Sequence, residues 1–419
     1  MDRIARYLQH DPPALGPALA RFRELARSRL DDWELRDGGS LSDGFVKRLQ
    51  DGSPPTPAEL EASPLSWLKA IDRELFDTTA PGAKTPGTPV FDGDDKHWIV
   101  RRVRPGTGFN ARKCKPGYYT PWHHVLSACI EGIPTQVRSV PHDTAMACAT
   151  IVSKNAFKVA IARFEDGVVE TFSQFDDIKL FRMEGLDNPQ TRLQSALDAL
   201  TKACLEAVDC LIFPELTFTP DIARSFAEHL LDSALTSVPN LPPLVVLGSY
   251  HEATRTIERP DTRNRALLLA HDGSQLMCFD KRSKVLFKFE PDGPDWAEAL
   301  APCETPYELL PLDAGLVGLA ICKDLFDGSI SDLLRKLDLD WLLVPSMSDK
   351  LTQHEGKTKQ LHHQSGTVSI VANQAMPGQA GGKSYPCGYV QQGPSPEPCA
   401  DPFTIVTLSL AASRLRIVK

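Results

Sequence analysis

A regular alternation of short apolar segments and amphipathic segments from about residue 157 to residue 410 constrains the fold more than any other feature. Residues 157–164 and 208–213 are apolar enough to be strands that are buried on both faces. Between them, residues 188–207 carry apolar side chains at helical spacing. A strand, a crossover helix and a second strand make up the repeating unit of α/β sheets. The sequence therefore predicts a layered α/β fold for this part of the chain.

The same alternation continues towards the end of the sequence. Helices are predicted at 220–237, 329–339 and 351–366, and strands at 243–250, 315–321, 340–346, 367–373 and 402–410. A hairpin is predicted over residues 264–281, because the pair Asp272-Gly273 favours a tight turn between two apolar runs. No internal repeat is found.

The first 155 residues differ from the rest in composition and in the spacing of their apolar residues. They are predicted to form an amino-terminal extension, with the α/β domain at 156–419. Apolar residues between Leu15 and Trp33 recur at steps of three and four, which predicts one amphipathic helix. Residues 51–63 and 78–95 are rich in Pro, Gly, Thr and Asp, as linkers are. Residues 97–106 resemble a strand followed by a turn.

Composition excludes several classes of function. A net charge of -8 gives no electrostatic reason to expect a nucleic-acid or membrane surface. No apolar stretch approaches the roughly 20 residues that span a bilayer, and the first residues lack the apolar core of a secretory signal. The ten cysteines include no CxxC pair. We therefore expect a cytoplasmic protein with reduced cysteines that binds neither nucleic acid nor a membrane.

Three chemically reactive groups stand at the ends of predicted strands. Glu215 follows the apolar run in "CLIFPEL", and Cys322 follows the run in "GLVGLAICKDLF". The return strand of the hairpin ends near Lys281 and Lys284. The carboxyl ends of strands are where α/β sheets place reacting groups. Because a thiol is mostly protonated at pH 7, it needs either a carboxylate as general base or a cation that lowers its pKa.

Each of these residues also has a simpler interpretation. Taken alone, Glu215 is typical of a solvated acid at a strand end, and Cys322 of a buried structural cysteine. Asp324 is typical of an acid that interacts with a helix N-terminus. His123 and His124, and likewise His354, His362 and His363, lack a second ligand pair at metal-site spacing, so no metal site is expected.

The ordered set of motifs resembles the nitrilase or carbon-nitrogen hydrolase superfamily over about residues 156–410. The resemblance rests on "FPEL", an Asp-Gly hairpin that leads to a lysine, "GLAICKDLF" and "DWLLVPS", together with landmarks such as Asn188 and "VAN" at 371–373. It implies a four-layer αββα sandwich with a Glu, Lys and Cys catalytic set and no cofactor or metal. It also implies a homodimer or a larger homo-oligomer.

The resemblance assigns roles to particular residues. Glu215 would be the general base and Cys322 the nucleophile, while a lysine and the backbone N–H of Lys323 would stabilise the oxyanion. Lys281 lies eight residues beyond Gly273, the spacing of typical members, and is favoured. Lys284 is the alternative. It stands six residues before Glu290, and this spacing resembles that of family members in which a second, structural glutamate follows the catalytic lysine. Three positions apart on a strand, the two lysines face opposite sides, so only one can serve.

These roles predict a thiol hydrolase that cleaves a non-peptide carbon-nitrogen bond through a thioester, with an amide or carbamoyl substrate preferred to a nitrile. Lys323 after the cysteine and "RSK" after Lys281 depart from the common pattern and mark a distant member. An activated Cys322 should react with iodoacetamide ahead of the other cysteines. Two alternatives remain. In one, the enzyme transfers the acyl group or ammonia to an acceptor. In the other, the domain is a hydrolase-like scaffold, and residues 1–155 attach it to a protein partner.

Overall fold

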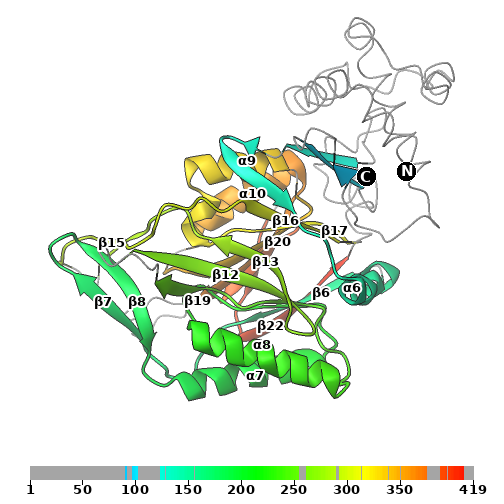
Figure 1. Cartoon of the computed structure of the whole chain (residues 1–419), viewed down its shortest axis with the longest axis horizontal. Helices are drawn as coiled ribbons and strands as arrows, with labels where there is room; N and C mark the ends of the chain where they lie inside the picture. The colour runs from blue at the N-terminus through cyan, green and yellow to red at the C-terminus, as the bar shows by residue number, and fades with distance from the viewer. Residues whose placement is uncertain are drawn as a thin grey trace, which may run out of the picture.

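The computed structural model describes most of the chain beyond residue 122. The described residues are 90–91, 97–101, 123–127, 129–154, 156–253, 261–288, 292–312, 314–337, 339–349, 351–374, 387–393 and 395–409. Two large sheets lie face to face, and a pair of helices covers the outer face of each (Figure 1). The four-layer αββα architecture that the motifs imply is therefore confirmed.

The first sheet has seven strands in the order β11-β12-β10-β9-β6-β22, with β13 paired to β12. These are β6 (Ala156–Ala162), β9 (Cys210–Ile212), β10 (Leu244–Val246), β11 (Tyr250–Ala253), β12 (Thr262–Ala270), β13 (Gln275–Asp280) and β22 (Phe403–Ser409). Strand β9 is parallel to both β6 and β10. Helices α7 (Pro189–Leu205) and α8 (Pro220–Leu235) cover this sheet, and the side chains of Asn188 and Thr219 cap their first turns.

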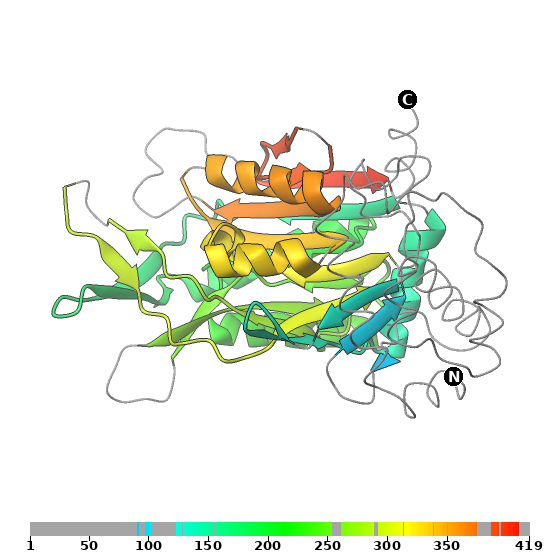
Figure 2. The same ribbon diagram turned by 90° about the horizontal axis from the view of Figure 1, so that it is seen from above.

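The second sheet has eight strands in the order β21-β20-β19-β18-β17-β16-β5-β4. These are β4 (Cys129–Ile130), β5 (Ile133–Val137), β16 (Tyr307–Leu312), β17 (Gly315–Leu319), β18 (Trp341–Met347), β19 (Val368–Gln374), β20 (Gly388–Gln391) and β21 (Glu397–Cys399). Strands β17, β18 and β19 are parallel. Helices α9 (Gly328–Leu337) and α10 (Thr352–Ser365) cover it and lie side by side in Figure 2. Strand β5 pairs with β16, so this sheet includes strands from before residue 156, and α6 (His142–Lys154) leads from β5 to β6.

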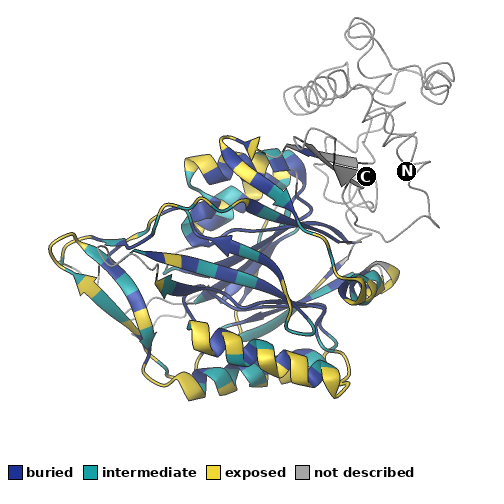
Figure 3. Cartoon of the chain, in the orientation of Figure 1, coloured by how far each residue is buried: buried dark blue, intermediate teal, exposed yellow. Residues whose placement is uncertain are grey.

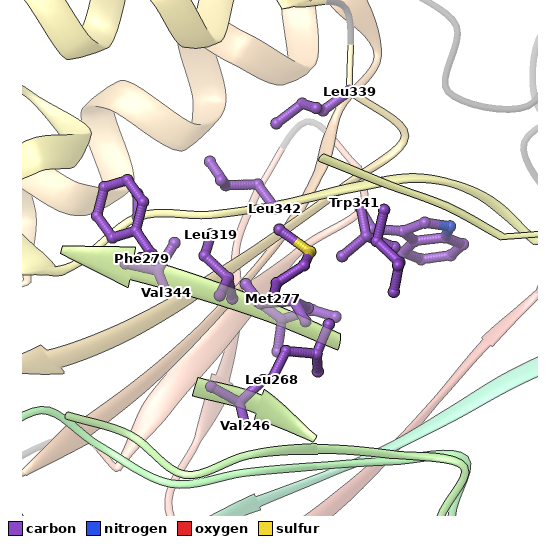
Figure 4. Packing of buried hydrophobic residues seen from close by; sticks show 14 of the residues in the cluster. Val246, Leu268, Met277, Phe279, Leu319, Leu339, Trp341, Leu342 and Val344 are labelled. Atoms are coloured by element: carbon purple, nitrogen blue, oxygen red, sulfur yellow. The ribbon is translucent and has the colours of Figure 1, made fainter. Parts of the chain in front are cut away.

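Apolar side chains fill the space between the layers. One continuous cluster joins the inner faces of both sheets to α9 and α10, and Figure 4 shows part of it, including Val246, Met277 and Leu319. A second cluster lies between the first sheet and helices α7 and α8. The outward faces of those two helices are exposed (Figure 3). The two sheets are therefore held in a rigid mutual position, which matters because groups from both meet at one end.

Two smaller sheets complete the described structure. One contains β7 (Glu170–Phe175), β8 (Leu180–Leu186), β14 (Leu286–Phe287) and β15 (Trp296–Glu298) and projects at the left of Figure 1. The other contains β1 (Val90–Phe91), β2 (His97–Arg101) and β3 (His123–Ser127). None of the helices that the structure describes is both long and apolar enough to cross a membrane.

The predicted strands and helices beyond residue 156 are present, with one difference in the segment 243–250. There, β10 ends at Val246 and β11 begins at Tyr250, because Gly248 adopts a φ of +67° between them. A Cβ at Gly248 would lie 2.0 Å from the carbonyl oxygen of Pro214, so only glycine allows this close approach. The predicted helix between Leu15 and Trp33 and the linker at 51–63 lie outside the described residues. Of the linker predicted at 78–95, only Val90 and Phe91 are described, and they form strand β1. The division of the chain at residue 155 stays a prediction.

Candidate active site

Glu215 is buried at the carboxyl end of β9 and is bonded to groups from both large sheets. Its backbone N–H donates to the carbonyl of Ser346 at 3.3 Å, and its Oε2 accepts from the backbone N–H of Met347 at 3.0 Å. Its Oε1 accepts from Asn264 Nδ2 at 2.9 Å and from Lys281 Nζ at 2.7 Å. With only 2 % of its surface exposed, Glu215 is not a solvated acid at a strand end.

Lys281 directly follows β13 and carries its ammonium group into the interior. Nζ donates to Glu215 and to Glu298, at 2.7 Å in each case. Burial opposes the positive charge, but the two carboxylates outweigh it and hold the pKa of Lys281 well above its usual value. Lys284, in contrast, is exposed, so of the two candidate lysines only Lys281 faces Glu215.

Glu298, at the end of β15, is a second buried carboxylate that the sequence did not single out. Its Oε2 accepts from Lys281, and its Oε1 accepts from Asn264 Nδ2 at 2.7 Å and from His251 Nε2 at 3.0 Å. Burial alone would raise its pKa, but Lys281 and His251 lower the pKa of Glu298 to about 2. Glu290, which the resemblance suggested as a second, structural glutamate, lies outside the described residues.

His251 holds Glu298 through a defined tautomer. The backbone N–H of Met183, in β8, donates to His251 Nδ1 at 2.8 Å, so that nitrogen carries no proton. The ring proton is therefore on Nε2, which donates it to Glu298. In this way His251, in β11, ties the first large sheet to two strands of the projecting sheet, β8 and β15.

Cys322 is presented from the other large sheet, on a short 3-10 turn (Cys322–Leu325) that follows β17. Its φ of 45° lies in the left-handed region, which is uncommon for a residue with a side chain. Its Sγ donates to the backbone carbonyl of Met347 at 3.9 Å. Burial, and then the charge of Glu215, raise the pKa of the Cys322 thiol to about 12. The resting thiol is therefore protonated at neutral pH.

The end of β18 lies between the acid and the thiol. Met347 donates its backbone N–H to Glu215, while its carbonyl faces the sulfur of Cys322. Because β9 and β17 belong to different sheets, the packing of the two sheets sets the position of one group relative to the other. The structure thus brings Glu215, Lys281 and Cys322 together at one end of the sandwich.

Lys323 and Asp324 follow Cys322 on the short 3-10 turn, and the side chains of both bond to the segment 282–284. The carboxylate of Asp324 is fully buried and accepts from the backbone N–H of Ser283 at 2.8 Å and of Arg282 at 3.2 Å. It thereby links the turn of Cys322 to the segment that follows Lys281. Burial raises the pKa of Asp324 to about 7. The side chain of Lys323 is directed away and donates to the backbone carbonyl of Lys284 at 2.6 Å.

Among the described residues, no group of three His, Cys, Asp or Glu side chains is arranged to hold a metal ion. His354 is buried and bonds to Ser346, whereas His362 and His363 stack edge to face near the end of α10. The side chains of His123 and His124 lie outside the described part of the structure.

Sequence reasoning missed Glu298, His251, Ser346 and the bridging role of Asn264. Glu298 and His251 are isolated polar residues in short buried strands, with no spacing that relates them to Lys281. Asn264 opens a segment that was recognised as a landmark, and Ser346 ends another. The sequence therefore contained a signal that pointed to Asn264 and Ser346, but none that pointed to Glu298 and His251.

Comparisons with known proteins find similarities among solved structures. No family model matches the sequence, and no curated protein matches it. Among solved structures, the chain is similar to an amidase from Nesterenkonia sp. at 18% identity and a TM-score of 0.39, covering 62% of this chain and 92% of that one. It is also similar to Nit3 from Saccharomyces cerevisiae, a member of branch 10 of the nitrilase superfamily, at 17% identity and a TM-score of 0.42, covering 62% and 94%. The C. elegans NitFhit protein shows 15% identity and a TM-score of 0.44, covering 62% of each chain. All three TM-scores lie below 0.5 and all three identities below 25%, so these similarities carry no conclusion about the family, the reaction or the substrate.

Proposed function

We propose that this protein is a carbon-nitrogen hydrolase that cleaves a small amide or carbamoyl substrate, with a nitrile as the less favoured possibility, through a thioester on Cys322. The observation that carries the proposal is the placement of Lys281, whose ammonium group bridges Glu215 and Glu298 beside the Cys322 thiol. An acid, a cation and a thiol that are all buried together have no simple structural explanation, because burying charges is costly.

The first step would be attack of Cys322 on the substrate carbon. The pKa of about 12 argues against a preformed thiolate, so the sulfur must lose its proton as it attacks. Oε2 of Glu215 accepts only one backbone N–H, which leaves a lone pair for that proton. The new carbon-sulfur bond pushes the carbonyl electron pair onto oxygen.

The oxyanion would be stabilised by Lys281 and by the backbone N–H of Lys323. Two of the three donors of the Lys281 ammonium bond to carboxylates, so the third would be directed at the substrate oxygen. One such donor is typically worth about 3 kcal/mol in the transition state. Collapse of the intermediate breaks the carbon-nitrogen bond, and the proton held by Glu215 goes to the leaving amine or ammonia.

Hydrolysis of the thioester would repeat the same chemistry with water. Glu215 takes a proton from water, the hydroxide adds to the carbonyl carbon, and the carbon-sulfur bond breaks with its electron pair going to sulfur. The proton on Glu215 then returns to the sulfur, and the acid product leaves. In this proposal Glu298 takes no proton, and it keeps Lys281 charged and oriented. The reaction needs no metal or organic cofactor.

Burial supports a small substrate. Residues Glu215 and Lys281 are each 2 % exposed and Cys322 is 5 % exposed, so a folded polypeptide backbone has no access to the sulfur. We also propose, from the sequence expectations alone, a cytoplasmic homo-oligomer whose residues 1–155 contact a protein partner.

Thioester trapping tests the proposal. The full-length protein would be mixed with a panel of short-chain amides, carbamoyl compounds and nitriles, quenched with acid and weighed intact. We expect a mass increase equal to the acyl group on the wild type and none on Cys322→Ala. Product analysis with added amines separates hydrolysis from acyl transfer. A wild type that is never acylated, together with a Cys322→Ala variant that keeps full activity, would exclude the mechanism.

A further inference from the structure

The backbone turns sharply where it presents Glu215, over an elbow formed by residues 214–218. Leu216 adopts a φ of +53° there, in the left-handed region. For a residue with a side chain this conformation is unfavourable and persists only where neighbouring contacts fix it. Ser249 supplies two such contacts: its Oγ accepts from the backbone N–H of Leu216 at 3.1 Å, and its carbonyl accepts from the N–H of Phe218 at 3.5 Å. The elbow is thus held firmly on one side.

Arg192, in α7, holds the elbow from another side. Its Nη1 donates to the backbone carbonyl of Thr217 at 2.9 Å. The arginine is only 1 % exposed, and its Cζ lies 4.4 Å from the centroid of the Phe164 ring. Thr217 is also fully buried, so solvent cannot replace this donor.

The other donors of Arg192 reach the segment that leads from β6 into the projecting sheet. Nε and Nη2 donate to the two carboxylate oxygens of Asp166, at 2.8 and 3.4 Å. Nη1 and Nη2 contact Oε1 of Glu170, the first residue of β7, at 3.4 and 3.3 Å. Nη2 also donates to the carbonyl of Val168 at 3.2 Å. One guanidinium group therefore joins the elbow to the base of the projecting sheet.

Stability alone does not explain this arrangement. A buried ion network is weak evidence for stability, because removing its charges from water costs about as much as their pairing gains. Arg192 also lies in the first turn of α7, where the helix dipole disfavours a positive charge. What an arginine does supply is a rigid fork of donors with fixed directions. Such a fork can set the position of one segment relative to another.

The same sheet positions the second carboxylate of the site. Glu298 ends β15, which pairs with β8 of the projecting sheet. Both carboxylates that bond to Lys281 are therefore placed by that sheet, Glu298 directly and Glu215 through Arg192.

We infer that Arg192 is a positioning residue for Glu215. Its bond to the carbonyl of Thr217 keeps the elbow in the conformation in which Glu215 reaches Lys281 and the end of β18. The inference rests on the proposed function only for the role of Glu215 as general base. Arg192 acts through the backbone of the elbow and takes part in no proton transfer.

Hydrogen exchange at one backbone amide reports the position of Glu215 without any substrate. The N–H of Met347, in the eight-stranded sheet, donates to Oε2 of Glu215 at 3.0 Å. When Arg192→Met releases the elbow, this N–H should exchange about 10- to 100-fold faster, as expected for the loss of a hydrogen bond to a charged group. Exchange would be followed at single residues by mass spectrometry. Dividing the rate by that of Leu343, in the same strand, removes changes in overall stability.

Three further variants separate positioning from a loss of folding. Asp166→Asn weakens the ion pair but keeps the donor to Thr217, so urea should unfold it at a lower concentration while Met347 exchanges as in the wild type. Arg224→Met removes an exposed arginine of α8 and should change neither property. If Arg192→Met does not fold, the triple variant with Asp166→Asn and Glu170→Gln tests the same bond, because it leaves no buried carboxylate without its cation.

The outcomes separate this inference from the proposed function. Unchanged relative exchange at Met347 in the folded Arg192 variant would overturn the positioning role. Equally fast exchange in Asp166→Asn would also overturn it, because the ion pair would then hold the elbow. If exchange quickens as expected but no thioester forms on the wild type, Arg192 positions Glu215 for a reaction of another kind.

A substrate found by thioester trapping adds a second measurement. Because a displacement of about 1 Å can cost about 100-fold in rate, kcat of Arg192→Met should fall by about that factor. KM should change much less, since the inferred role concerns the general base and not substrate binding. A normal kcat in a variant with fast exchange at Met347 would show that the position of Glu215 does not limit the reaction, and would overturn the role of Arg192 in it.

Discussion

The ammonium nitrogen of Lys281 lies 2.7 Å from a carboxylate oxygen of Glu298, although the two residues come from different sheets. Lys281 extends from the seven-stranded sheet, and Glu298 ends a strand of the projecting sheet. Both side chains are almost completely buried. The pair therefore both joins two parts of the fold and keeps a cation next to the thiol, and four predictions follow from this arrangement and its neighbours.

Replacing Lys281 should damage both stability and activity, whereas replacing Lys284 should damage neither. Lys281→Met leaves two buried carboxylates without their cation, which typically costs about 3–5 kcal/mol of the free energy of unfolding. It also removes the proposed oxyanion donor. Lys284→Met changes an exposed side chain and should stay within about 0.5 kcal/mol of the wild type. Urea unfolding and acylation rates would be measured for both; a stable, active Lys281→Met would exclude its role.

Glu215→Gln should abolish acylation while Cys322 remains in place. The amide cannot accept the proton of a thiol, and the loss of a general base typically costs about 10²- to 10⁴-fold in rate. Single-turnover acylation followed by intact mass measures this directly. Glu228→Gln on the exposed side of α8 is the matched control and should behave as the wild type does. Equal acylation rates in the two variants would mean that another group removes the proton.

His251→Phe should lower both the stability and the turnover of the enzyme. The change leaves the backbone N–H of Met183 without its partner, and an unsatisfied buried group of this kind costs about 1–3 kcal/mol. It also removes one of the two donors to Oε1 of Glu298, which keeps its bond to Asn264. Because Glu298 then loses one of its anchors, we expect kcat to fall more than the affinity for substrate. Thermal unfolding and steady-state kinetics would be compared with His229→Ala, an exposed change on α8. A variant with normal kcat would show that His251 serves packing only.

Asp324→Asn should change how stability depends on pH. The folded-state pKa of Asp324 is about 7, above the value of roughly 3.9 in an unfolded chain. Between these values the folded state binds more protons than the unfolded state, so the wild type loses stability as the pH rises from about 4 to about 7. The difference of about three pH units corresponds to roughly 4 kcal/mol at most.

Urea unfolding of the wild type and Asp324→Asn at several pH values between 4 and 7.5 measures this effect. We expect the wild type to gain on the variant as the pH falls, because the variant has no group to titrate at this position. Other carboxylates titrate in both proteins and cancel in the comparison. Parallel stability curves would mean that Asp324 is ionised in the folded protein throughout this range.

One expectation about reactivity changes with the structure. From the sequence, an activated Cys322 should react with iodoacetamide before the other cysteines. The structure buries this thiol and raises its pKa to about 12, while Cys129 is exposed. We now expect Cys129 to be labelled ahead of Cys322. High reactivity at Cys322 would instead require the substrate to be bound and Glu215 to take the proton.

The sequence by itself determined the order of the central strands and of the helices that cover them, since these follow from local periodicity and turn residues such as Asp272-Gly273. Strands β7, β8 and β14 to β16 were not predicted. It also placed Glu215 and Cys322 at strand ends. Only the tertiary structure decided that Lys281 and not Lys284 faces Glu215, and that Glu298, His251 and Ser346 complete the site. These residues come from three different sheets: His251 lies in β11 of the seven-stranded sheet, Glu298 ends β15 of the projecting sheet, and Ser346 lies in β18 of the eight-stranded sheet. A contact of that kind depends on how layers pack, and no spacing along the chain encodes it.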